Sequence, residues 1–220
     1  MKKVLGLVIS LAMIGFVMAQ EGSDPMVEVG ALSIASGTIA SHLAEMYGEE
    51  DSCADLTDMV EDDMMDDGVT PGLSCLLQLV MAANLVETLD GEGPFTVFAP
   101  TNDGIREFLE DNGTYTTFGD LAADTEMLTA VLMHHVVPMG MSLNDMYVAA
   151  DADVTDMITL ETAGGTEITV SFAGDLDPNQ EGVVEVGDGM MPMAYVNHRT
   201  ISVDNGYIIP IDNVLVPPME

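Results

Sequence analysis

The sequence predicts a single α+β domain in which helices come first and short strands follow. Between residues 33 and 134, apolar residues recur at three- and four-residue steps, the spacing of a buried helical face. Beyond Ser142, apolar and polar residues alternate and turn residues separate the runs, as in antiparallel strands. This order indicates an α+β domain and not repeated βαβ units. A chain of 220 residues has room for one such domain and an appendage.

Residues 1–19 have the parts of an export signal. Lys2 and Lys3 precede an apolar run from Val4 to Met18, and the small residue Ala19 follows. We expect cleavage after Ala19 and a secreted, periplasmic or cell-surface location. No later apolar run reaches the ~20 residues that span a bilayer, so we expect no transmembrane segment in the mature chain.

The charge is strongly acidic, with 38 Asp and Glu against 4 Lys and Arg and a formal net charge of −34. Once Lys2 and Lys3 leave with the signal peptide, Arg106 and Arg199 remain. This composition excludes nucleic acid and anionic membranes as partners, because too few cations are left to neutralise phosphate. It favours a halophilic surface, since ~1 M salt screens charges beyond ~3 Å. The alternative is a dedicated calcium-binding surface, and weak binding of divalent cations is expected in either case.

Residues 20–68 are predicted to form an acidic, partly helical N-terminal extension. Helical periodicity predicts a helix from Ser33 to Tyr47. A second helix is expected from Asp51 to Asp67, although its many acidic residues repel one another.

The domain itself is predicted to occupy residues 69–218 and to open with a helix from Thr70 to Leu89. Thr70 can cap the free amide groups, and the Pro that follows suits the first helical position. A strand is expected at 95–99, and Asn102 or Asp103 is expected to cap the next helix. A further helix is expected over 124–134.

The second half of the domain is predicted to be strands. Residues 157–161 and 166–172 form a hairpin pattern around Ala163-Gly164-Gly165. The other strands are expected at 183–186, 194–197, 200–203 and 207–216.

Cys53 and Cys75 are the two cysteines of the chain. In an exported protein they favour a disulfide, and two buried thiols are the alternative. The bridge would close a loop of about 22 residues and contribute roughly 3 kcal/mol. A zinc site is disfavoured, because two lone cysteines lack the paired spacing of such sites.

Three segments in order resemble the fasciclin (FAS1) family. They read GPFTVFAPTNDGI from Gly93, LTAVLMHHVVPMG from Leu128 and NGYIIPIDNVLVPP from Asn205. The resemblance implies a wedge or sandwich of short β-strands with several helices packed beside it. It also implies a role in extracellular adhesion or matrix interaction and no catalysis. We expect no cofactor, with calcium as the alternative. Two positions depart from the family pattern, since His134 replaces a Tyr and Ile209 replaces a His.

The motif residues are expected to serve architecture. Asn205-Gly206 is a tight-turn dipeptide, and Asp212 lies among apolar residues where it should accept backbone hydrogen bonds. The residues assigned structural roles are Phe95, Thr101, Asn102, His135, Asn205, Gly206, Asp212 and Asn213.

Metal sites are the alternative use of the polar and sulfur side chains. His134 and His135 are adjacent and so point in different directions, which argues against a shared metal. Asp175, Asp177 and Asn179 offer oxygens at alternate positions and are the weak calcium candidates, without the Gly and Glu of an EF-hand. Methionine clusters near residues 59–65, 139–146 and 190–193 could hold Cu(I), or fill a core poor in aromatics.

The sequence therefore predicts an exported, non-enzymatic module that binds a cell-surface or matrix protein or glycan. The sequence lacks three common enzyme motifs: the serine-nucleophile elbow, the phosphate-binding Gly-rich loop and the His-Glu-x-x-His motif. The alternative function is a secreted protein that binds calcium or copper.

Overall fold

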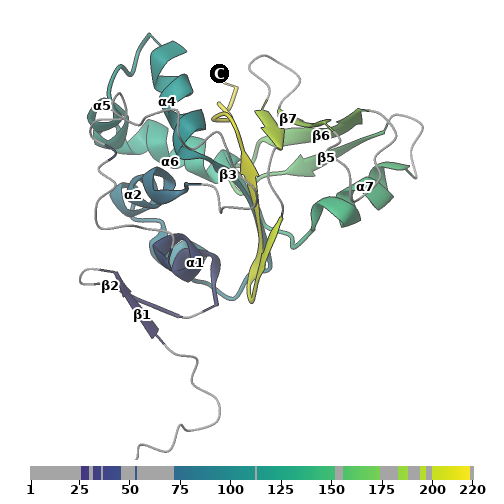
Figure 1. Ribbon diagram of the computed structural model, residues 1–220, viewed down its shortest axis with the longest axis horizontal. Coiled ribbons are helices and arrows are strands. Elements are labelled where there is room, and N and C mark those ends of the chain that lie inside the picture. Colours follow the sequence, from purple (N-terminus) through teal and green to yellow (C-terminus); the bar gives the residue numbers. More distant parts are fainter. Residues whose placement is uncertain are drawn as a thin grey trace, which may run out of the picture.

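The computed structural model describes residues 26–29, 32–35, 37–45, 53, 72–111, 113–151, 156–173, 183–187, 194–196 and 200–218. Figure 1 shows a central sheet with helices on one side and a second sheet, with one further helix, on the other. This α+β architecture, with its two small sheets, confirms the predicted fold class.

The central sheet has the strand order β4-β3-β10-β9. Strand β3 (Phe95–Pro100) pairs in parallel with β10 (Gly206–Ile211), so two of the family-like segments lie side by side. The short strands β4 (Val136–Val137) and β9 (Ile201–Val203) complete the edges. Both faces of β3 and β10 are covered, which explains their nearly continuous apolar sequence.

The second sheet is antiparallel, with the order β5-β6-β7-β8. The hairpin of β5 (Met157–Glu161) and β6 (Glu167–Ala173) confirms the predicted pairing. Its turn contains Gly165 at a φ of 76°. Strands β7 (Val183–Gly187) and β8 (Ala194–Val196) lie close to their predicted bounds.

Helices on one side of the central sheet enclose the larger apolar cluster, named here the helical core. Ile39 and Leu43 from helix α1 are fully buried in it, next to α2 and α3. The helices of this side are α1 (Ile39–Glu45), α2 (Ser74–Ala82), α3 (Val86–Leu89), α4 (Asn102–Asp111), α5 (Phe118–Ala123) and α6 (Thr125–His134).

The smaller cluster fills the space between the two sheets and is named here the inter-sheet core. Phe98 and Ile209 from the central sheet meet Ile168 and Val170 from β6. Helix α7 (Leu143–Asp151) adds Met146, which is fully buried.

Helix α7 corrects the prediction that only strands follow Ser142. Ser142 and Asp145 form a reciprocal cap at its start. The Asp145 N–H donates to Ser142 Oγ at 3.2 Å, and the Ser142 N–H donates to Asp145 Oδ2 at 2.9 Å. This pair was the sequence signal for the helix. The short helix α5, capped by Thr117, was also missed.

The predicted helix from Ser33 to Tyr47 is wrong in its first part. Strand β2 (Leu32–Ala35) pairs there with β1 (Met26–Val29), and α1 begins at Ile39. Four residues are too few for periodicity alone to separate a strand from a helix. The predicted helix from Asp51 to Asp67 lies outside the described residues, apart from Cys53.

The predicted helix from Thr70 to Leu89 is two helices. The first, α2, begins at Ser74 and ends at Ala82, and the second, α3, begins at Val86. Between them Asn84 adopts a left-handed φ of 57°. Strand β10 is also shorter than predicted and ends at Ile211, because the chain bends at Asp212 and Asn213.

Cys53 and Cys75 form a disulfide, as predicted, and both are fully buried. The bridge ties Cys53 to the first turn of α2. No helix in the described part of the chain has the length and apolar content needed to cross a bilayer.

Candidate functional site

His135 lies between the two cores and is fully buried. Its Nδ1 is 2.8 Å from the Val131 carbonyl oxygen, and its Nε2 accepts the Leu215 N–H at 2.9 Å. Because an acceptor faces Nδ1 and a donor faces Nε2, the ring is the neutral tautomer with its proton on Nδ1. Burial lowers the pKa of His135 to about 4, which keeps it neutral.

Asn205 joins three segments that are far apart in the sequence. Its Oδ1 accepts the Ile39 N–H at the start of α1, at 2.9 Å. Its Nδ2 donates to the carbonyl oxygens of Leu89 and Gly91, each at 2.8 Å. Its backbone carbonyl accepts the Phe95 N–H at 2.9 Å. The amide side chain therefore links the start of α1 to the end of α3 and the loop after it, and the backbone carbonyl holds the start of β3.

Gly206 has no room for a side chain. A Cβ atom there would lie 1.9 Å from the Phe95 carbonyl oxygen, and its φ is 151°. The glycine therefore allows β10 to start directly beside β3.

Asn102 does not cap its own helix as predicted. Thr101 does, since its Oγ1 accepts the Gly104 N–H at 3.2 Å. The Asn102 side chain caps α2 instead, where Oδ1 accepts the Cys75 N–H and Nδ2 donates to Ser74 Oγ, each at 3.0 Å. This cap from another helix explains why α2 begins at Ser74.

Asp212 joins the two sheets. Its Oδ1 accepts the Tyr195 N–H at 2.7 Å, and its own N–H donates to the Tyr195 carbonyl at 3.1 Å. Asn213 Oδ1 accepts the N–H of the next residue, Val214, at 2.8 Å. A Cβ on Gly104 would lie 2.6 Å from the Asp212 backbone, so α4 packs closely against this bend.

These buried polar residues occur in the three segments quoted above, and a fasciclin-domain family model matches residues 71–217. The chain belongs to the fasciclin domain family. It is similar to protein sll1483 of Synechocystis, with 34% identity over 146 residues that cover 66% of this chain and 68% of that protein. It is also similar to the immunogenic protein MPB70 of Mycobacterium bovis, with 30% identity over 142 residues, 64% of this chain and 58% of that one.

The structure of a FAS1 domain pair from the insect cell adhesion molecule fasciclin I has the same fold. The TM-score is 0.51 at 17% identity, over 64% of this chain and 44% of that one. In the present fasciclin domain, α1 lies outside the segment that matches the family model and still packs into the helical core.

The departure at His134 is accommodated by hydrogen bonding. This histidine is buried, and its Nδ1 lies 2.5 Å from Thr166 Oγ1 in the β5–β6 turn. Thr166 Oγ1 is also 2.8 Å from Thr162 Oγ1. His134 and His135 thus bond to different parts of the domain, and the sequence pattern did not indicate the threonine partners.

The predicted metal ligands are not brought together where the structure describes them. Met146 is buried, Met141 is half-buried and Met139 is 51% exposed, so these three sulfurs occupy different environments. Asp175, Asp177 and Asn179 lie outside the described residues. Among those that are described, no three His, Cys, Asp or Glu side chains are grouped in a way that could hold a metal ion.

The exposed charged residues in the described part of this fasciclin domain are acidic. Arg106 is the cation within the described residues. It lies 2.9 Å from Asp103 Oδ1 and 3.5 Å from Glu110 Oε1. Exposed acids are found on α3, α4, α5, α6, the β5–β6 hairpin and the connecting loops: Glu87, Glu92, Glu107, Asp111, Asp120, Asp124, Glu126, Glu161, Glu167 and Asp204.

Proposed function

We propose that this fasciclin domain is an exported, non-enzymatic binding module that contacts extracellular proteins through its acidic surface. The main support for the proposal is that the polar side chains of the family-like segments are already hydrogen-bonded inside the domain. His135, Asn205 and Asn102 are buried, and their side-chain hydrogen-bonding groups contact the backbone or a neighbouring side chain. Groups that are already paired and shielded from water are poorly suited to bind a substrate.

The fold neighbour supports a role in adhesion. A further relative is the pig transforming growth factor-beta-induced protein ig-h3, at 27% identity over 63% of this chain and 17% of that protein. The fold neighbour comes from an insect cell adhesion molecule. Fold alone does not fix function, so the surface of this chain has to supply the specificity.

The acidic surface favours a salt-rich environment. Net charge far from zero keeps a protein soluble but loosens its compact state through self-repulsion. At ~1 M salt the Debye length falls to ~3 Å, which removes most of that repulsion. We expect the melting temperature to rise between dilute buffer and molar salt. An unchanged melting temperature would contradict a halophilic surface.

A pull-down tests the binding function. The chain from Gln20 onward is immobilised and incubated with envelope and matrix proteins at ~0.15 M and ~1 M salt. The matched control is Gly206→Ala, which is expected not to fold. Capture of a defined protein by the folded chain alone supports the proposal. The proposal is overturned if the immobilised wild type and the immobilised Gly206→Ala variant capture the same proteins equally. It is also overturned if the chain has a catalytic activity that disappears with one His or carboxylate substitution.

A further inference from the structure

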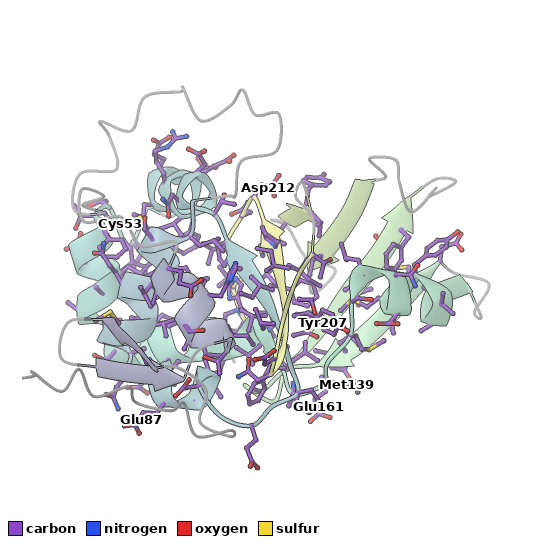
Figure 2. All side chains as sticks on the ribbon, turned by 60° about the horizontal axis from the view of Figure 1, so that its bottom comes forward. Cys53, Glu87, Met139, Glu161, Tyr207 and Asp212 are labelled. Atoms are coloured by element: carbon purple, nitrogen blue, oxygen red, sulfur yellow. A yellow bond between two sulfur atoms is a disulfide. The ribbon has the colours of Figure 1, made fainter. Side chains whose placement is uncertain are left out.

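One end of the domain presents exposed apolar side chains close to exposed acidic residues. Met139 is 51% exposed, Pro94 and Pro138 are exposed, and Tyr207 is half-buried. Figure 2 shows Met139, Tyr207 and the acidic residue Glu161 at the same end of the molecule. We name Pro94, Pro138, Met139 and Tyr207 the Met139 tip.

The loop that carries Met139 is held in place by the buried hydroxyl group of Thr96. Thr96 is fully buried in β3, and its Oγ1 donates to the Met139 carbonyl oxygen at 2.7 Å. The same atom accepts the Met141 N–H at 2.9 Å. The two bonded residues flank Gly140, so a single buried side chain holds the backbone on each side of this glycine.

Gly140 allows the loop to lie directly on two rings of the tip. A Cβ at this position would be 2.8 Å from Pro94 Cβ and 3.8 Å from Tyr207 Cε2. Because Tyr207 pairs with Thr96 in the β3–β10 ladder, the tyrosine is also fixed by the sheet. The tip is therefore preorganised, which lowers the conformational entropy that binding would cost.

Acidic residues lie close to the tip along the chain, and Figure 2 places one of them, Glu161, near Met139. Glu92 lies two residues before Pro94. Asp145 lies in the first turn of α7 and accepts the N–H of Ser142, at the end of the Met139 loop. Glu161 ends β5 and is followed closely by Ala163, whose N–H donates to the Val136 carbonyl oxygen at 2.7 Å. The hydrogen bond from the Ser142 side chain lowers the pKa of Asp145, which favours its charged form.

We propose that the Met139 tip is the docking surface of the module and binds an apolar site with a basic rim on a partner protein. This inference rests on the proposed binding function. Methionine suits such a contact, because its unbranched thioether adapts to the shape of a pocket. The neighbouring carboxylates select for Lys and Arg around that pocket. A second copy of this chain would instead bring like charges together, which disfavours self-association.

A peptide-binding assay tests the charge and apolar requirements together. Three labelled peptides of equal length are titrated with the mature chain at ~0.15 M salt, and fluorescence anisotropy reports binding. One alternates Leu with Lys, the second Ser with Lys and the third Leu with Glu. We expect the Leu/Lys peptide to bind at least about fivefold more tightly than either control.

Substitution of one exposed methionine assigns the binding to the tip. Met139→Gln removes the apolar end of the side chain, and Met81→Gln is the matched control because Met81 is 41% exposed on α2. We expect Met139→Gln to weaken Leu/Lys binding at least about fivefold and Met81→Gln to leave it unchanged. Methyl-¹³C methionine labelling should show the Met139 signal shifting on binding while the Met81 signal stays in place.

The tip assignment is overturned if Met139→Gln and Met81→Gln bind the Leu/Lys peptide with the same affinity, or if the Ser/Lys peptide binds as tightly as the Leu/Lys peptide. It is also overturned if sedimentation shows that Met139→Gln converts a wild-type dimer into a monomer. The pull-down separates this failure from failure of the proposed function. If Met139→Gln retains the proteins that the wild type captures, the module binds through another surface. If the wild type captures none, the binding function itself is wrong.

Discussion

The helical core and the inter-sheet core are closed by different kinds of contact. In the helical core, Asn205 and Asn102 reach across long sequence separations to backbone groups, and a disulfide adds a covalent tie. The inter-sheet core is closed mainly by strand ladders and the packing of α7. Specific amides are therefore expected to matter most on the helical side, where each one holds several segments.

The ladder between β3 and β10 belongs to both cores, so breaking it should have the largest effect. Gly206→Ala would place a Cβ 1.9 Å from the Phe95 carbonyl oxygen. We expect a loss of more than about 4 kcal/mol in the free energy of unfolding, or no folded protein. Urea denaturation in molar salt measures the loss.

Gly165→Ala is the matched control for backbone strain alone. This glycine has a φ of 76° and nothing within 4 Å of an added Cβ. It should cost about 1 kcal/mol. Equal losses for the two variants would show that strain, and not the close approach of β10 to β3, accounts for the effect of Gly206→Ala.

Asn205→Ala tests the helical side alone. It leaves the Ile39 N–H and the carbonyl oxygens of Leu89 and Gly91 without their present partner. At about 1 kcal/mol or more for each group, we expect a loss of about 3–4 kcal/mol. Hydrogen exchange should rise first in α1 and α3, while β5 and β6 stay protected.

Asn213→Ala serves as its control. The Asn213 side chain accepts one hydrogen bond, from the adjacent Val214. The variant should lose no more than about 1 kcal/mol. A similar loss in both variants would contradict the difference proposed between the two cores.

Local signals predicted the parts of the fold whose stabilising contacts are also local. The β5–β6 hairpin follows from alternation around a Gly-rich turn. The start of α6 follows from Asp124, whose Oδ1 accepts the Met127 N–H at 3.1 Å. The start of α2 could not be predicted, because its cap comes from Asn102 in another helix. The break at Asn84 also depends on packing, since the apolar periodicity continues through it.

The sequence predicted that the candidate site residues serve the architecture, but it did not predict which groups they contact. Asn205-Gly206 indicated a turn, but nothing in the sequence shows that the amide reaches α1 and the end of α3. The hydroxyl of Thr96 beneath the Met139 loop was also missed, because a threonine in a buried strand has no local signal for a distant carbonyl.

Reduction of the disulfide should have the next largest effect on the helical side. Opening the Cys53–Cys75 bridge restores conformational freedom to the unfolded chain. We expect the free energy of unfolding to fall by roughly 3 kcal/mol. The double variant Cys53→Ala/Cys75→Ala, compared with the reduced wild type, separates this effect from the free thiols. A loss below about 1 kcal/mol would show that the bridge adds little to the helical core.

The smallest effect concerns His135, which joins the two cores. Its pKa is about 4 in the folded chain and about 6.5 in an unfolded one. The unfolded state therefore binds the proton more readily, so stability is complete above pH ~6.5 and falls as the pH drops toward ~4. The expected loss is about 2 kcal/mol at pH ~5. Urea denaturation in molar salt, which screens the carboxylates, gives the pH profile of the wild type and of His135→Gln. The difference between the profiles should change over this pH range. A constant difference would mean that the proton equilibrium of His135 does not couple the two cores to pH.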